Sequence, residues 1–215
     1  VMDYLDEISP AARMIGACNT VVVSEEGKLI GYNTDGRGFT ENIRAHGVEG
    51  KGKKLLILGT GGAANAISIQ TALEGAAEIT IFNRRDEFFA SGQKIVEKLA
   101  GEVPDCKAEM CDLEDQERLA AAVRDSDILI NATKVGMKPM DGDTLIPAEL
   151  LHPGLIVADT VYNPLETRLL REAKEAGCQV IGGIGMLLWQ GAAAFQLFTG
   201  REMPVKEVEE RFFAE

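Results

Sequence analysis

Residues 55–69, LLILGTGGAANAISI, join a short apolar run to a segment with helical spacing through a cluster of glycines. The six residues from Gly59 to Ala64 fit the pattern G-x-G-x-x-G/A, with Ala64 in the last place. Glycine at the first position permits a tight strand-to-helix turn, and Gly61 removes the Cβ that would block a pyrophosphate. Glycines also mark ordinary turns, but this cluster lies between a strand and a helix, which favours dinucleotide binding. We therefore expect a cofactor to contact Gly59, Thr60, Gly61, Gly62 and Ala63.

Strand-like and helix-like segments alternate on both sides of this stretch. The expected strands are residues 54–59, 78–83, 106–112, 126–133, 154–162 and 178–183. The expected helices between them are residues 62–75, 85–101, 113–125 and 164–177, the last with Pro at its start and Gly at its end. Such alternation implies βαβ units and a parallel sheet. The sequence therefore predicts an α/β fold with a doubly wound, Rossmann-type parallel sheet.

Two regions lie outside this pattern. Residues 1–50 contain two β-like segments, 19–24 and 28–34, followed by a helix over 36–47. About 50 residues with so few apolar positions would build only a marginal core, so we interpret them as the tail of another domain. A family resemblance carried by the motifs below implies that they are the remnant of an N-terminal α/β substrate domain. Residues 51–183 form the expected dinucleotide-binding domain. Residues 184–215 are predicted to form two helices that pack back toward the substrate domain.

Composition narrows the class of protein. The chain has 215 residues, 46% of them hydrophobic, which predicts a packed globular core. Its net charge of −12 argues against a general nucleic-acid binder. No apolar run is long enough to span a membrane, and the acidic start does not resemble a signal peptide, so we expect a cytoplasmic protein. The four cysteines have no C-x-x-C spacing and are expected to be reduced thiols, and we expect no metal site.

The end of the second expected strand carries FNRRDEFF, residues 82–89. An acid here accepts hydrogen bonds from a ribose 2′-hydroxyl and favours NAD, whereas an arginine pairs with a 2′-phosphate and favours NADP. Both kinds of residue are present, so the sequence leaves NAD and NADP open. Asp86 could also simply cap the following helix. The candidate contacts in this loop are Asn83, Arg84, Arg85 and Asp86.

Seven segments together resemble one known family. They are GACNTVV (16–22), GYNTDGRGF (31–39), GTGGAANAI (59–67), FNRRDEFF (82–89), NATKVGM (131–137), VYNPLETRLL (161–170) and GMLLWQGAAAF (185–195). They resemble the shikimate dehydrogenase family, most closely its branch of bifunctional quinate/shikimate dehydrogenases. The resemblance implies a two-domain enzyme that transfers a hydride reversibly between NAD or NADP and shikimate or quinate in an interdomain cleft.

The resemblance also implies roles for individual residues. Asp35 would be the catalytic aspartate that orients the reacting hydroxyl, and Asn19, Tyr162 and Gln190 would be further substrate contacts. Thr133, Lys134, Gly185 and Met186 would lie along the cofactor. Structural alternatives remain open: Thr34 or Asp35 as a helix N-cap, Asn19 as a turn residue, Tyr162 as a strand anchor, Lys134 as an exposed loop residue and Met186 as core packing.

The family lysine and the serines that hold the substrate carboxylate would lie before Val1, and no lysine occurs before Lys28. We therefore expect these 215 residues to bind cofactor but to turn over shikimate negligibly. A non-catalytic ligand-binding module of the same family is the main alternative. A different Rossmann reductase is a third reading, although YNTDG and LLWQG argue against it. The expected partner is a small molecule, and the oligomeric state is open, with a homodimer as one option.

Overall fold

The protein is built around a sheet of six parallel strands in the order β6-β5-β4-β7-β8-β9. The structure is a computed structural model and describes residues 1–213. The strands of this sheet are β4 (Lys54–Leu58), β5 (Glu78–Asn83), β6 (Lys107–Asp112), β7 (Ile128–Asn131), β8 (Ile156–Asp159) and β9 (Gln179–Ile181). The chain adds strands outward from β4 on one side and then returns to its other side with β7, which confirms the predicted doubly wound order.

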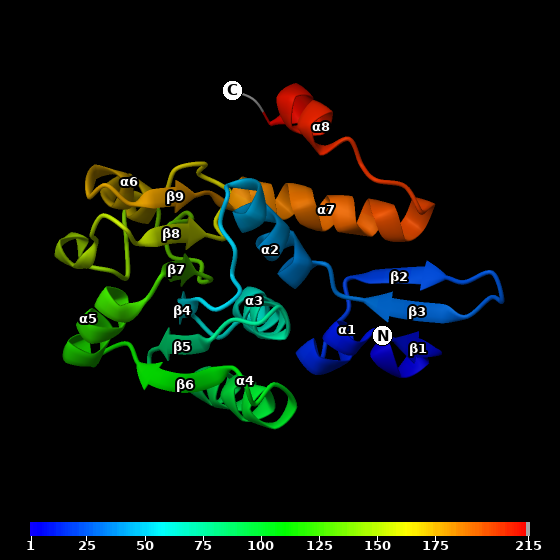
Figure 1. The fold of residues 1–215 in the computed structure, drawn as a ribbon, viewed down its shortest axis with the longest axis horizontal. Helices are drawn as coiled ribbons and strands as arrows, with labels where there is room; N and C mark the ends of the chain where they lie inside the picture. The colour runs from blue at the N-terminus through cyan, green and yellow to red at the C-terminus, as the bar shows by residue number, and fades with distance from the viewer. Residues whose placement is uncertain (214–215) are drawn as a thin grey trace.

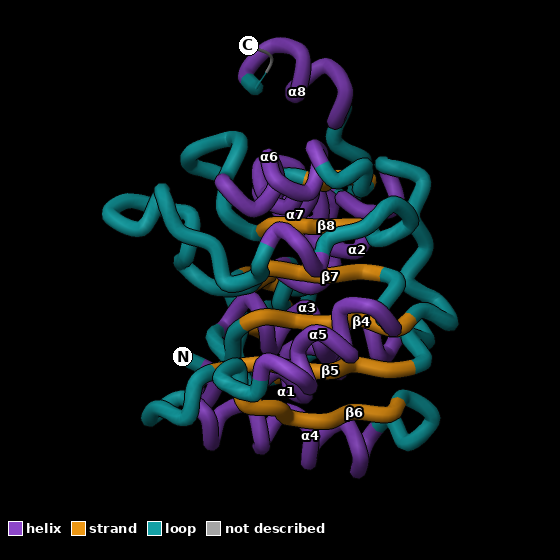
Figure 2. The backbone as a smooth tube through the Cα atoms, turned by 90° about the vertical axis from the view of Figure 1, so that its left-hand side faces the viewer, coloured by secondary structure: helices purple, strands orange, loops and turns teal. Residues whose placement is uncertain are grey.

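The side chains of the strands alternate between two apolar layers. Leu55 and Ile57 face α3 (Gly62–Leu73) and α4 (Phe89–Glu102). Leu56 and Leu58 face α5 (Gln116–Asp125) and α6 (Arg168–Glu175). Because both faces are covered, the strands read as continuous apolar runs in the sequence. Figure 1 shows the two pairs of helices on opposite sides of the sheet, and Figure 2 shows β8, β7, β4, β5 and β6 stacked one above another.

A second, smaller sheet lies at the N-terminal end of the chain. It contains β1 (Glu7–Ile8), β3 (Leu29–Tyr32) and β2 (Thr20–Val23) in that order, with β2 and β3 antiparallel. The short helices η1 (Met2–Tyr4) and α1 (Pro10–Ile15) accompany it. Then α2 (Asp35–Ala45) runs from this sheet to the larger one (Figure 1). The sequence predicts β2, β3 and α2 but not η1, β1 or α1, which are too short to show a period.

Two further helices complete the chain, α7 (Gly183–Thr199) and α8 (Val205–Phe212), and η2 (Ala148–Leu150) precedes β8. The last two residues of the predicted C-terminal helix, 214–215, lie outside the described residues. Helix α7 packs along α2, and this contact has no space for side chains at two points. A Cβ on Gly38 would lie 2.7 Å from the Cβ of Gln190, and a Cβ on Gly185 would overlap the side chain of Asn42.

Two predicted helix starts are wrong by four residues. The helix expected from Arg85 begins only at Phe89, because the carboxylate of Asp86 accepts a hydrogen bond from the backbone of Phe88 and holds the preceding residues in a loop. The helix expected from Pro164 begins at Arg168. Its N-cap is Thr167, whose hydroxyl accepts a hydrogen bond from the Leu170 N–H group.

Candidate active site

The candidate site lies where the order of the strands reverses. Strand β4 has β5 on one side and β7 on the other, and the loops that follow them leave the sheet in opposite directions. In open α/β sheets, ligands bind in the crevice at the carboxyl ends of the strands at this point. The loops after β4, β5, β7 and β8 carry the predicted turn at 59–62, the loop 83–86, residues 133–134 and Tyr162.

The glycine turn has one position with no room for a side chain and two with open space. Gly59 has φ of +102°, and a Cβ there would lie 2.8 Å from Cγ2 of Thr133. In contrast, Gly61 and Gly62 would have no atom within 4 Å of an added Cβ. The turn opens onto a cavity of about 390 Å³ that is also lined by Thr60, Asn65, Phe88, Ser91, Lys94, Ile95 and Lys98.

This turn fits a dinucleotide. Gly61 is the N-cap of α3 and has no side chain to cap the helix, so the first N–H groups of the helix are available to a phosphate. The bare surface at Gly61 and Gly62 would allow close approach of a pyrophosphate. Ala64 is fully buried against the sheet, as the motif requires of its last residue.

The loop after β5 holds one carboxylate in a fixed position. Asp86 Oδ1 accepts hydrogen bonds from Asn83 Nδ2 at 3.0 Å and from the Phe88 N–H at 2.9 Å. Among the described residues none donates to Oδ2, which can therefore accept a ribose hydroxyl. Asp86 orders the loop but is not the N-cap of α4, which is Phe88. Arg84 is exposed, and Arg85 pairs with Asp112 at the end of β6.

The loops after β7 and β8 are tied together by a buried carboxylate. Asp159 Oδ1 accepts from Asn131 Nδ2 and from the Val161 N–H, both at 2.9 Å. Its Oδ2 accepts from the Thr167 hydroxyl at 2.7 Å. Burial raises the pKa of Asp159, although these hydrogen bonds oppose the rise. Asn131 in turn accepts a hydrogen bond from the Thr133 hydroxyl at 2.7 Å.

This network positions predicted site residues, and sequence reasoning missed it. The Asn131 side chain fixes Thr133, and Lys134 follows it as an exposed residue. Asp159 fixes Val161, and Tyr162 follows with 47% of its surface exposed. A lone Asp at the end of an apolar strand signals buried partners, since an isolated carboxylate is rarely buried without them.

Three of the four predicted substrate residues, Asn19, Asp35 and Gln190, lie together. Asn19 Nδ2 donates to Asp35 Oδ1 at 2.9 Å, and Asn19 Oδ1 accepts from the Thr34 N–H at 3.0 Å. The Thr34 hydroxyl lies 3.3 Å from Gln190 Oε1, so Thr34 links Asn19 to Gln190. Thr34 is the N-cap residue of α2, but its side chain does not cap the helix. Its linking role has no local sequence signal.

Asp35 is half-buried at the first position of α2. Burial raises the pKa of its carboxyl group above the ordinary aspartate value, and the hydrogen bond from Asn19 partly opposes this. The start of α2 also packs closely against α3. A Cβ on Gly36 would lie 2.6 Å from the Ala66 carbonyl oxygen, one turn into α3. The Asn19–Asp35–Gln190 cluster therefore adjoins the helix that begins at the glycine turn.

The two remaining predicted residues lie in α7. Gly185 faces Asn42 of α2, so its lack of a side chain serves the packing of these helices. Met186 is half-buried and packs against the main apolar cluster. The sequence left core packing open as the alternative for Met186, and this packing is what the structure contains.

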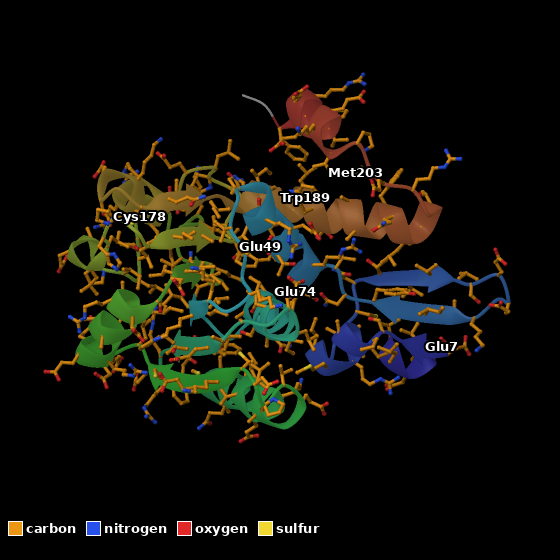
Figure 3. The ribbon with its side chains drawn as sticks, in the orientation of Figure 1. Glu7, Glu49, Glu74, Cys178, Trp189 and Met203 are labelled. Atoms are coloured by element: carbon orange, nitrogen blue, oxygen red, sulfur yellow. The ribbon has the colours of Figure 1, made fainter. Side chains whose placement is uncertain are left out.

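A cavity larger than the one at the glycine turn lies away from these loops. It measures about 720 Å³ and lies between α2, α7 and α8, with Trp189 and Met203 in its lining (Figure 3). We place the candidate site at the strand ends instead, because the bare glycine turn, the fixed Asp86 and the raised pKa of Asp35 are found there. None of the helices within residues 1–213 is long and apolar enough to cross a membrane.

The fold and this site define a dinucleotide-binding α/β protein of the Rossmann type. Comparison with known proteins identifies the family. Residues 183–211 match the Shikimate 5'-dehydrogenase C-terminal domain. The chain is 52% identical over 211 residues to the shikimate dehydrogenase (NADP(+)) of Listeria monocytogenes, covering 98% of this chain and 72% of the relative. The chain belongs to the shikimate dehydrogenase family.

Two further comparisons agree with this family membership. A quinate/shikimate dehydrogenase of Escherichia coli is 48% identical over 209 residues, which cover 97% of this chain and 72% of the relative. The crystal structure of the Listeria monocytogenes shikimate 5-dehydrogenase in complex with shikimate and NAD has a TM-score of 0.95 to this structure. It is 51% identical, and the match covers 97% of this chain and 72% of that one.

Proposed function

We propose that this chain is the cofactor-binding and cleft-forming part of an NAD- or NADP-dependent dehydrogenase of shikimate or quinate. The observation that carries the proposal is the bare turn at Gly61 and Gly62, at the N-terminus of α3 and at the switch point of the sheet. Family membership supports it, since the relatives are named as shikimate and quinate/shikimate dehydrogenases. A bound nicotinamide would supply or accept the hydride.

The cofactor would lie along the carboxyl ends of the strands. The N–H groups at residues 59–63 would hold the pyrophosphate. Asn83, Arg84, Arg85 and Asp86 would hold the adenosine ribose, with the second oxygen of Asp86 toward a ribose hydroxyl. Thr133 and Lys134 would lie beside the nicotinamide half, fixed there by the Asn131–Asp159 network. Gly185 and Met186 would bound this end of the site from α7.

The substrate would occupy the cluster around Asp35. A secondary alcohol must lose its O–H proton as the hydride leaves, and a carboxylate can accept that hydrogen bond and orient the oxygen. Asp35 is suited to this role because Asn19 and the start of α2 stabilise its charge. Asn19, Gln190 and Tyr162 would contact other substrate hydroxyl groups.

This assignment divides the chain into three parts. Residues 1–50 would belong to the substrate-binding domain, residues 51–183 to the cofactor-binding domain, and residues 184–215 to helices that return toward the substrate side. Packing of α7 along α2, through Gly38 and Gly185, supports the last part. A cytoplasmic location and a homodimer remain predictions, and sedimentation equilibrium would measure the oligomeric state.

Titration calorimetry tests the proposal. We expect heat with NAD or NADP, and loss of that heat in Gly61→Ser, whose Cβ enters the space of the pyrophosphate. Shikimate and quinate are then titrated into the cofactor-saturated protein. Gln190→Ala is expected to lower the affinity for whichever of the two binds. A well-folded protein that gives no heat with either nucleotide would contradict the proposal.

A further inference from the structure

Arg85, in the loop after β5, is held by a residue on the next strand. Strands β5 and β6 end side by side, with Asn83 paired to Asp112. Arg85 Nε donates to Asp112 Oδ2 at 2.7 Å, and its guanidinium carbon lies 4.9 Å from the centre of the Phe89 ring. Arg85 is therefore held by an acid and by an aromatic face, although 71% of its side chain is exposed.

Asp112 is better fixed than the arginine that it holds. Its side chain is 20% exposed, and its Oδ1 accepts a hydrogen bond from the Glu114 N–H at 3.0 Å. The pair thus has one largely buried member, Asp112, and one exposed member, Arg85. A 2′-phosphate that binds Arg85 must therefore compete with the charge of Asp112.

The same loop presents Asp86, whose Oδ1 is fixed by Asn83 and Phe88. A fixed acid favours a ribose 2′-hydroxyl, whereas a guanidinium favours a 2′-phosphate, with which it forms paired hydrogen bonds. Arg84 is exposed in the same loop, and the position of Arg85 therefore sets whether the loop offers a second guanidinium to a 2′-phosphate. In the structure Arg85 is engaged by Asp112.

We propose that Asp112 is a positioning residue for cofactor selectivity: it holds Arg85 on β6 and thereby keeps the loop selective for a free 2′-hydroxyl, that is, for NAD over NADP. This inference rests on the proposed function, because it concerns the same cofactor site. It assigns a role to a residue outside the loop, which acts through Arg85 and does not itself touch the nucleotide.

The test compares the dissociation constants of NAD and NADP, measured by calorimetry, in the original protein and in Asp112→Asn. The variant keeps an oxygen for the Glu114 N–H but loses the charge that holds Arg85. We expect NADP affinity to rise on the order of tenfold, the effect of one charge-assisted contact, while NAD affinity changes less than about twofold.

Two controls separate release of Arg85 from a general loss of negative charge. Glu87→Gln removes one charge from the same loop, and in the structure of residues 1–213 Glu87 forms no ion pair. We expect it to leave the ratio of the two constants unchanged. Arg85→Ala provides the second control: in that background, Asp112→Asn should no longer change the ratio.

The inference is overturned if Asp112→Asn leaves the ratio unmoved, if Glu87→Gln moves it equally, or if the effect persists without Arg85. In each of those cases normal NAD binding would leave the proposed function intact. A protein that binds neither nucleotide overturns both. Thermal unfolding of each variant shows that the comparison is made on folded protein.

Discussion

The side-chain amide of Asn19 donates a hydrogen bond of 2.9 Å to Oδ1 of Asp35. This bond joins the residue before β2 to the first residue of α2 and counteracts the effect of burial on the carboxylate. Burial raises the pKa of Asp35, and the amide lowers it. Asn19 therefore partly offsets the effect of burial on the pKa of the proposed catalytic residue.

We predict that Asn19→Ala raises the pKa of Asp35 further, because it removes the hydrogen bond to the charged form while leaving the burial. NMR titration of the Asp35 carboxyl carbon measures this directly. An unchanged midpoint would show that another group stabilises the charge.

The raised pKa of Asp35 also makes the free energy of unfolding depend on pH in the acid range. Asp35 binds its proton more tightly in the folded state than in the unfolded state. Its contribution to stability is therefore complete below the unfolded pKa and is lost as the pH rises through the folded pKa. We expect Asp35→Asn to remove this fall in unfolding free energy. Urea unfolding at several pH values above the ordinary aspartate pKa measures the difference between variant and original.

Substitutions at Gly59 and Gly61 should differ in their effect on the free energy of unfolding. Gly59→Ala places a Cβ 2.8 Å from Thr133 at a positive φ and should cost about 1–3 kcal/mol of unfolding free energy. Gly61→Ser has open space and a good N-cap residue, so its stability should change by less than about 0.5 kcal/mol. Urea unfolding and NAD titration of both variants test this. Equal losses of stability would contradict the assignment of Gly61 to the ligand.

The parts of this protein that were predictable from sequence are those with local signals. The glycine turn, the six strands and the doubly wound order follow from apolar runs, turn residues and chain alternation. Helix starts at 89 and 168 were missed because Asp86 and Thr167 order their loops through single side chains. A pattern of apolar positions does not register such bonds.

Contacts between distant residues had no signal in the sequence. Asn131 and Asp159 are 28 positions apart, and Thr34 and Gln190 are 156 apart. Their pairing depends on which strand ends adjoin and on how α7 lies against α2. The family resemblance named candidate site residues without this knowledge, but the groups that hold them, Thr34, Asp112 and Asp159, required the three-dimensional arrangement.

Cys106 should be an unreactive thiol in the folded protein. Burial, with a smaller contribution from the negative charge of Glu78, raises its pKa from 9.0 to about 11. At pH 8 the thiolate fraction should then be about a hundredfold lower than that of an ordinary cysteine, since only the thiolate reacts. Alkylation by iodoacetamide, followed by mass spectrometry of the peptide, measures the rate in folded and urea-unfolded protein. Equal rates would contradict this assignment.

Asp159 should be the most sensitive polar position of the sheet. It is 2% exposed and accepts from Asn131, Val161 and Thr167, so Asp159→Ala would leave three donors without their acceptor. We expect a loss of about 2–5 kcal/mol in unfolding free energy.

Asp159→Asn, which keeps one acceptor oxygen for Asn131 and Val161, should cost less than the alanine variant. Thr167→Val provides a second comparison, because it removes one bond to Asp159 together with the cap of α6. Urea unfolding of the two single variants and of the double variant Asp159→Ala/Thr167→Val measures their coupling. If the network acts as a unit, the double variant loses less than the sum of the two single losses. Strict additivity would mean that Asp159 acts on the two loops independently of Thr167.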